Sequence, residues 1–219
     1  MENNKEKLKK LESQYNKYIK IIKYILLIAL FIFLILAIRF MFIFSILNKS
    51  IQIEETPSST INMKKTYSFI YPDFPENNTG YIYYCKDGVI VMKAGFVETY
   101  SIDNKYYSFY TTSDPKTYSI HELSSNETWE DLSFLKKIIV IAVRTSSYFT
   151  ANISHEELNG KKCVVFTIND EKAYYDEQTS LHVKTVSKNS IVDIKYEFDV
   201  VTYEDIKLPN LNEYILQDD

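Results

Sequence analysis

The feature that most constrains this chain is one long apolar stretch near its N-terminus, residues 24–47, interrupted only by Arg39 and Ser45. A helix of that length extends roughly 36 Å at ~1.5 Å per residue, whereas the hydrocarbon layer of a bilayer is ~30 Å thick. Arginine is costly at the membrane centre but less so near the surface, which the Arg39 side chain can reach by snorkelling outwards. The stretch therefore predicts one transmembrane helix over residues 24–47.

The charges on either side of this stretch predict its orientation. Seven lysines precede it: Lys5, Lys7, Lys9, Lys10, Lys17, Lys20 and Lys23. Because lysine-rich flanks stay in the cytoplasm, we expect a cytoplasmic, basic juxtamembrane helix over residues 1–23 and an extracytoplasmic C-terminal domain. The apolar run is longer than the ~7–15 residues typical of a cleaved signal peptide, and no small-x-small cleavage pattern follows it. We interpret it as the uncleaved signal-anchor of a single-pass protein of the cell membrane.

The juxtamembrane segment carries an apolar stripe at alternating three- and four-residue spacing. Its members are Leu8, Leu11, Tyr15, Tyr18 and Ile22. Such spacing is typical of a coiled coil, which would make the chain a homodimer. The same segment is equally suited to lie on the anionic inner leaflet, held there by its lysines. The sequence leaves both interpretations open.

Charge is divided unevenly between the two ends of the chain. Residues 1–49 hold nine Lys/Arg and three Glu, a net of +6, whereas the remainder holds sixteen Lys/Arg and twenty-six Asp/Glu, a net of −10. An acidic body argues against binding nucleic acid, which requires a basic surface to neutralise phosphates. Polar residues 48–65 are interpreted as a linker, and residues 66–219 suffice for one domain with a core of its own.

Most of this domain has the sequence pattern of short strands. Asp87-Gly88 separates two apolar runs, residues 81–86 and 89–93, and this dipeptide strongly favours a two-residue hairpin turn. Asp103-Asn104 predicts a second hairpin in the same way. Further strands are expected over residues 98–102, 105–112, 117–123, 148–154, 163–169, 172–176, 181–188 and 191–201.

One segment between the strands has helical spacing. Its apolar positions include Trp129, Leu132, Leu135 and Ile139. In the last strand, Val192, Ile194, Tyr196 and Phe198 alternate with charged residues, which predicts one face towards the interior and one towards water. Strands, one helix and then more strands indicate an α+β domain, in which a curved antiparallel sheet packs on that helix.

Residues 160–209 resemble the lipoprotein-carrier superfamily (LolA, LolB, LppX and RseB). The likeness rests on a strand at residues 160–166, a tight connection at residues 174–181, and a strand at residues 191–200 that leads into Asp205-Ile206-Lys207-Leu208-Pro209. It implies an open half-barrel around a helix, with an apolar ligand cavity. By position, that cavity would be lined by Val192, Ile194, Tyr196 and Phe198 facing Trp129, Leu132, Leu135 and Ile139.

A permanent anchor departs from the pattern of a diffusing carrier. The resemblance therefore implies a membrane-tethered binding module, of a sensor or receptor kind, for an apolar ligand, a lipid or a lipoprotein segment. The alternative is a structural or protein-interaction membrane protein with no small-molecule ligand. Tyrosines at positions 81, 83, 84, 106, 107 and 110 would supply its recognition surface, although such residues equally serve as sheet packing.

The residue patterns of known catalytic and metal sites do not appear in the sequence, so we expect neither an enzyme nor a cofactor. The three histidines, His121, His155 and His182, are scattered, and His155 lacks the second histidine four residues on that a zinc-binding helix needs. Acidic pairs such as Asp176-Glu177 lie in expected turns, where solvated charge is the ordinary interpretation. Cys85 and Cys163 are either a disulfide or two buried thiols.

Overall fold

The computed structural model describes residues 2–54, 61–71, 74–103, 105–122 and 133–217. The chain divides into two compact units, Met1–Ile43 and Phe44–Asp219, and each is described by itself.

The first long element is helix α1, Glu2–Glu54. Its segment Gln14–Ile51 is long and apolar enough to cross a membrane, and its most apolar window is wholly exposed. The helix covers the whole expected apolar span and continues seven residues beyond its expected end at residue 47. Leu47 and Ile51, in the last turns of α1, are buried within the second unit. The expected linker over residues 48–65 thus begins as helix, and the first strand starts at Met63.

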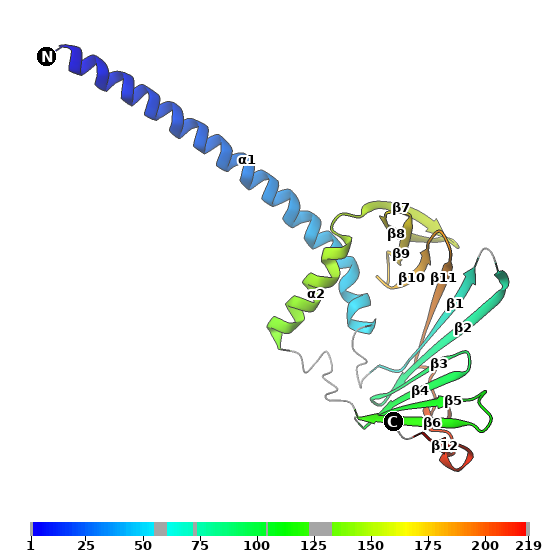
Figure 1. Cartoon of the computed structure of the whole chain (residues 1–219). Coiled ribbons are helices and arrows are strands. Elements are labelled where there is room, and N and C mark those ends of the chain that lie inside the picture. Colours follow the sequence, from blue (N-terminus) through cyan, green and yellow to red (C-terminus); the bar gives the residue numbers. More distant parts are fainter. Residues whose placement is uncertain (1, 55–60, 72–73, 104, 123–132, 218–219) are drawn as a thin grey trace. The chain divides into compact units, whose positions relative to one another are not determined.

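Twelve strands of the described residues form one sheet, in which two antiparallel meanders can be recognised (Figure 1). The first meander contains β1 Met63–Tyr71, β2 Phe74–Lys86, β3 Val89–Ala94, β4 Val97–Ile102, β5 Lys105–Tyr110 and β6 Thr117–Glu122. The second contains β7 Asn152–Leu158, β8 Lys161–Ile168, β9 Glu171–Asp176, β10 His182–Val186 and β11 Ile191–Phe198. Within each meander, every strand pairs with the next along the chain.

The two meanders join where β1 pairs with β11, antiparallel, from Met63 opposite Phe198 to Ile70 opposite Ile191. The resulting order is β12-β6-β5-β4-β3-β2-β1-β11-β10-β9-β8-β7. Strand β12, Ile215–Leu216, pairs with β6 and is the parallel member. The expectation of an α+β protein with a long apolar helix and a large antiparallel sheet is confirmed.

The hairpin at Asp87-Gly88 is present as expected between β2 and β3. Both residues have positive φ, 52° and 75°, which suits the right-handed twist of the flanking strands. Asp103 between β4 and β5 also has positive φ, 48°, and its partner in the expected turn, residue 104, lies outside the described residues.

The C-terminal segment covers one face of the first meander. Helix α3, Tyr203–Ile206, is followed by the 3₁₀ turn η1, Leu211–Glu213, and by β12. Val201 and Ile206 join Tyr84, Val91, Tyr100 and Phe109 in one buried cluster. The rings of Phe109 and Tyr214 meet edge to face, with centroids 5.0 Å apart. This tail therefore supplies the second layer of the domain's main core.

Helix α2, Phe134–Tyr148, connects the two meanders. Ser133 caps it by accepting a hydrogen bond from the Lys136 N–H at 3.3 Å. The expected start of this helix, including Trp129 and Leu132, lies outside the described residues. The strand expected at residues 148–154 is wrong at its beginning, because α2 runs through Tyr148 and β7 starts at Asn152.

The contact of α2 with the sheet is made at its C-terminal end. The Tyr148 ring packs edge to face on Phe166 of β8 and Tyr175 of β9, and its hydroxyl lies 3.1 Å from that of Tyr175. Farther up the helix, Leu135 and Ile139 are 67% and 53% exposed.

Candidate functional site

One pocket of the second meander, called the principal pocket below because it has more lining residues than its neighbours, has a volume of about 440 Å³. Five adjacent strands, β7 to β11, and the β7–β8 turn contribute to its wall. The lining residues are Leu158, Asn159, Lys161, Cys163, Asp176, Val183, Lys184, Asp193 and Ile194. This volume falls within the usual range for small-molecule sites, ~300–1,000 Å³.

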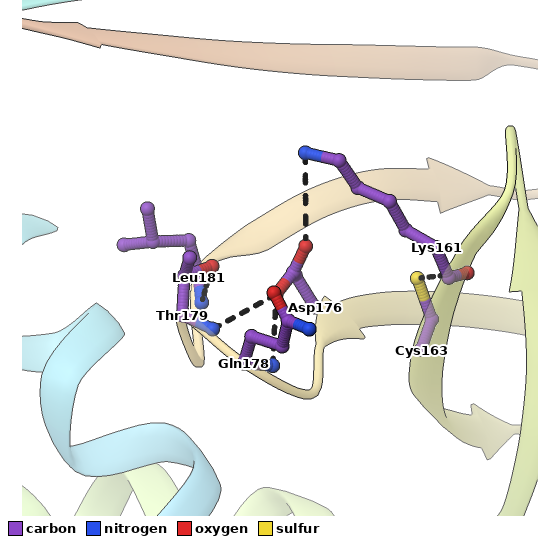
Figure 2. A network of polar contacts seen from close by, with 6 residues as sticks. All are labelled: Lys161, Cys163, Asp176, Gln178, Thr179 and Leu181. Carbon is purple, nitrogen blue, oxygen red and sulfur yellow. Dashed lines mark hydrogen bonds and ion pairs between the residues drawn. The ribbon is translucent and has the colours of Figure 1, made fainter.

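Asp176, the last residue of β9, is held in this pocket by hydrogen bonds and an ion pair (Figure 2). Its Oδ1 accepts hydrogen bonds from the backbone N–H groups of Gln178 and Thr179, at 2.9 and 2.8 Å. Its Oδ2 faces the Lys161 ammonium at 3.9 Å. The turn is closed by the Asp176 N–H, which donates to the Leu181 carbonyl at 2.9 Å. The strand end, the turn and the carboxylate therefore form one unit.

These contacts decide the ionisation of Asp176, which is only 4% exposed. Burial alone would raise the pKa of its carboxyl. The hydrogen bonds from Thr179 and Gln178, together with the Lys161 charge, outweigh burial and leave this pKa below its ordinary value. Asp176 is thus a buried carboxylate, and the interpretation of this turn acid as solvated is wrong.

A second ion pair forms part of the same wall. Lys184 of β10 and Asp193 of β11 lie directly opposite one another in the sheet, with Nζ 3.2 Å from Oδ1. A pair of opposite charges directly across two neighbouring strands stabilises the sheet by roughly 0.2–1 kcal/mol. The pocket thus presents two Lys–Asp pairs, one from each side of the β9–β10 connection.

The apolar part of the pocket belongs to a small cluster beneath it. Cys163, Val165 and Tyr174 are buried there, and Leu158, Val183 and Val186 pack against them. Burial is the main cause that raises the pKa of the Cys163 thiol. Its Sγ lies 3.8 Å from the Lys161 carbonyl oxygen. A protonated, inward-turned thiol is a poor nucleophile, so Cys163 acts here as a small apolar side chain.

Two neighbouring pockets flank the β7–β8 hairpin, with volumes of about 490 and 450 Å³. At their rim, His155 Nδ1 and Glu177 Oε1 are 2.5 Å apart. Nearby, Glu156 accepts hydrogen bonds from Lys172 Nζ at 2.7 Å and from the Tyr174 hydroxyl at 3.0 Å. The bond from Lys172 is the main cause that lowers the pKa of Glu156. These polar side chains bond to one another along the strand edge.

The charged residues that line the pocket lie in pairs. Its carboxylates face ammonium or backbone N–H groups, and its thiol is protonated. Within the described residues, no group of three or more His, Cys, Asp or Glu side chains is placed to hold a metal ion. A half-apolar floor with fixed charges at its rim can hold a ligand that has both an apolar and a charged part.

The structure brings together little of the cavity implied by the family resemblance. Ile194 is buried and lines the principal pocket, whereas Val192 and Tyr196 are half-buried elsewhere on β11. Phe198 is 44% exposed, because β11 ends there and the next residue, Asp199, turns with φ of 60°. Leu135 and Ile139 are exposed on α2, and Trp129 and Leu132 lie outside the described residues.

The two cysteines are thiols in this structure, not a disulfide. Cys85 lies on β2 and Cys163 on β8, five places apart in the strand order. The tyrosines proposed as a recognition surface divide between the two faces of the first meander. Tyr84 and Tyr107 belong to the core cluster, which favours the packing interpretation for those two.

Sequence reasoning missed the charged residues of the pocket. Asp176 lies in the expected turn, and the polar Gln178-Thr179 that follows it was an available indication that its carboxylate caps the turn. Lys184 and Asp193 become neighbours only through the register of β10 with β11, which a single sequence does not reveal.

No protein-family model matches this chain, and no curated protein matches it. The likeness to the lipoprotein-carrier superfamily therefore rests on the residues quoted for it above.

Proposed function

We propose that this protein is a single-pass membrane protein whose sheet domain is an extracytoplasmic binding module. The observation that carries the proposal lies in α1, whose segment Gln14–Ile51 is long and apolar enough to cross a membrane and contains an 18-residue apolar window with no buried residue. Soluble monomers rarely expose apolar patches beyond a few hundred Å², so a helix apolar on all sides over this length needs a hydrocarbon environment. The lysines before residue 24 favour a cytoplasmic N-terminus.

Anchoring and orientation are tested on the full chain in intact cells with a membrane-impermeant thiol reagent. Two matched variants each introduce one cysteine at an exposed position, Gln14→Cys before the span and Phe96→Cys in the sheet domain. We expect Phe96→Cys to react in intact cells and Gln14→Cys to react only after lysis. The opposite pattern would reverse the orientation, and release of the protein by alkaline carbonate would exclude an integral anchor.

The ligand that we propose for the domain combines an apolar part with a charged group, as a lipid or lipoprotein segment does. The apolar floor of the principal pocket, with Cys163 and Val183, suits the first part, and the Lys161–Asp176 and Lys184–Asp193 pairs at its rim suit the second. The open half-barrel around a helix implied by the family resemblance belongs to this proposal. In the structure, α2 meets the sheet through Tyr148, which packs on Phe166 and Tyr175.

Ligand binding is tested with a fluorescent acyl probe and by native mass spectrometry of the gently extracted full chain. Val183→Trp would fill the pocket, whereas Val200→Trp places the same bulk at an exposed position outside it. We expect Val183→Trp to abolish the fluorescence gain and Val200→Trp to retain it. Equal binding by both variants, or no bound lipid or probe in the unmodified chain, would count against this site.

A second candidate function is protein interaction, favoured by the outer strand β7. Within the described residues, β7 pairs with β8 alone, so its other edge offers backbone groups to which an extended peptide can add. Homodimerisation through Leu8, Leu11, Tyr15, Tyr18 and Ile22 remains a separate prediction for α1. Cysteine crosslinking at Tyr15→Cys in intact cells tests the dimer, and the absence of a crosslinked dimer would argue against it.

A further inference from the structure

Helix α2 leaves an apolar face exposed that the sheet does not cover. Its exposed large apolar side chains are Phe134, Leu135, Ile138, Ile139 and Val143, with Phe134 80% exposed. Burial of α2 is confined to its C-terminal end. Thr145, on the same helical stripe as Phe134 and Ile138, is fully buried there and donates to the Ile141 carbonyl at 2.6 Å, and Tyr148 packs on the sheet. Within the described residues, the helix thus contacts the sheet through Tyr148 in its last turn, and its preceding turns carry exposed apolar side chains.

The charge of α2 differs from that of the domain around it. The helix contains Lys136, Lys137 and Arg144 and has no acidic residue, whereas residues 50–219 as a whole carry a net charge of −10. An apolar face combined with basic residues is typical of helices that lie in the interface of a bilayer, where anionic headgroups attract the basic groups.

The length of α2 distinguishes a helix that lies on a membrane from one that crosses it. Its 15 residues extend about 22 Å, short of the ~30 Å hydrocarbon layer. The helix also ends in Ser146 and Ser147, whose hydroxyls donate to the carbonyls of Val143 and Arg144 at 2.6 and 2.7 Å. A short apolar helix that is fixed at one end to a folded domain suits shallow burial of its free face.

We propose that α2 is a second membrane contact, whose face of Phe134, Leu135, Ile138, Ile139 and Val143 inserts into the anionic surface of the bilayer that holds α1. This inference rests on the proposed function, because α1 keeps the domain beside the membrane. The bilayer is then the apolar surface at the highest local concentration, so even a modest affinity of α2 keeps the contact formed.

The test uses the full chain reconstituted in vesicles of phosphatidylcholine with phosphatidylglycerol. Nitroxide labels are placed at Ile139→Cys on α2, at Ile32→Cys on α1 and at Phe96→Cys in the β3–β4 turn, all exposed positions. The native Cys85 and Cys163 are each 1% exposed, so the label reacts with the introduced thiol. Relaxation by oxygen, which concentrates in lipid, is compared with relaxation by a water-soluble nickel chelate.

We expect oxygen to relax the labels at positions 139 and 32 more than nickel does, and the reverse at position 96. Replacing phosphatidylglycerol by phosphatidylcholine should shift the label at 139 towards nickel. A label at 139 that behaves like the one at 96, while 32 stays immersed, would overturn this inference alone. A label at 32 in water would overturn the anchor as well. Spin–spin broadening at 139 would show that a second copy covers the face, and would overturn the membrane contact.

Discussion

The side chain of Asn62 bonds to the backbone of Val201 twice, across 139 residues of sequence. Its Nδ2 donates to the Val201 carbonyl at 3.0 Å, and the Val201 N–H donates to its Oδ1 at 2.9 Å. The Asp199 N–H also donates to the Asn62 carbonyl at 2.9 Å. These bonds extend the β1–β11 ladder beyond the pair of Met63 and Phe198, and they lead the chain towards α3 and the main core.

Replacing Asn62 should therefore loosen the junction of the two meanders. We expect Asn62→Ala to lower the free energy of unfolding by about 1–3 kcal/mol, because buried backbone groups of Val201 lose their partners. Urea denaturation of the full chain in detergent micelles measures the change. Asn189→Ala, at an exposed turn position, is the matched control and should change stability little. Equal midpoints for the two variants would refute this role of Asn62.

The main core predicts a contrast between two phenylalanines of the first meander. Phe109 is fully buried between Tyr100, Tyr118 and Tyr214, whereas Phe96 is 57% exposed in a turn. We expect Phe109→Ala to cost about 3–5 kcal/mol of stability. Phe96→Ala should stay within about 0.5 kcal/mol of the unmodified chain. Thermal unfolding followed by circular dichroism compares them, and a larger loss at Phe96 would contradict the described packing.

Local sequence rules predicted the features of this fold that depend on neighbouring residues. The hairpin at Asp87-Gly88 follows from the positive φ that those residues adopt readily. The apolar span of α1 follows from its continuous apolar composition. The alternation expected in β11 is present only in part, because Ile194 is buried whereas Phe198 is exposed. The β1–β11 junction and the covering of Tyr100 and Phe109 by residues 201–214 depend on contacts between distant segments, which periodicity does not encode.

The buried carboxylate of Asp176 predicts acid sensitivity. Its pKa is lowered in the folded protein by hydrogen bonds that outweigh burial, whereas an unfolded aspartate titrates near ~3.9. The carboxylate therefore contributes stability that is complete above the unfolded pKa and is lost as pH falls through the lower, folded pKa. Asp176→Asn should be less stable at neutral pH, and this deficit should shrink over the acidic pH range below the unfolded pKa of about 3.9.

Denaturant midpoints over that pH range measure the effect in Asp176→Asn and in Asp170→Asn, which alters an exposed turn acid. The control should follow the unmodified chain at every pH. A deficit in Asp176→Asn that is independent of pH would mean that shape, and not charge, accounts for the role of this side chain.

The burial of both cysteines predicts that their thiols react slowly with alkylating reagents. Burial raises the pKa of Cys85 to about 11 and raises that of Cys163 as well, so few thiolates exist near neutral pH. We expect iodoacetamide to leave both unmodified in the folded chain and to modify both in urea without reductant, as mass spectrometry can count. Ser68→Cys, on an exposed position of β1, should react at once. A chain that gains alkyl groups only after reduction would contain a disulfide.

The sequence predicted the residues of the candidate pocket less well than it predicted the fold. The residues expected to form a cavity include Phe198, which is exposed because the strand ends with it, and Ile139, which is exposed because α2 contacts the sheet by its last turn. Ile194 reaches the pocket through the register of β11 with β10, together with Asp193 and Lys184. Strand periodicity predicts which face of the sheet a side chain lies on. Its neighbours on that face depend on how the strands pair, which periodicity does not predict.

The junction of β1 with β11 has a consequence for biogenesis. The first strand to emerge from the ribosome finds its second partner only when residues 191–198 have been synthesised, near the end of the chain. Until then, the edge of β1 that faces away from β2 has no partner strand, although the other five strands of its meander have already been synthesised. A nascent edge of this kind is prone to pair with other chains, so maturation of the domain depends on how quickly residues 191–198 follow residues 63–71.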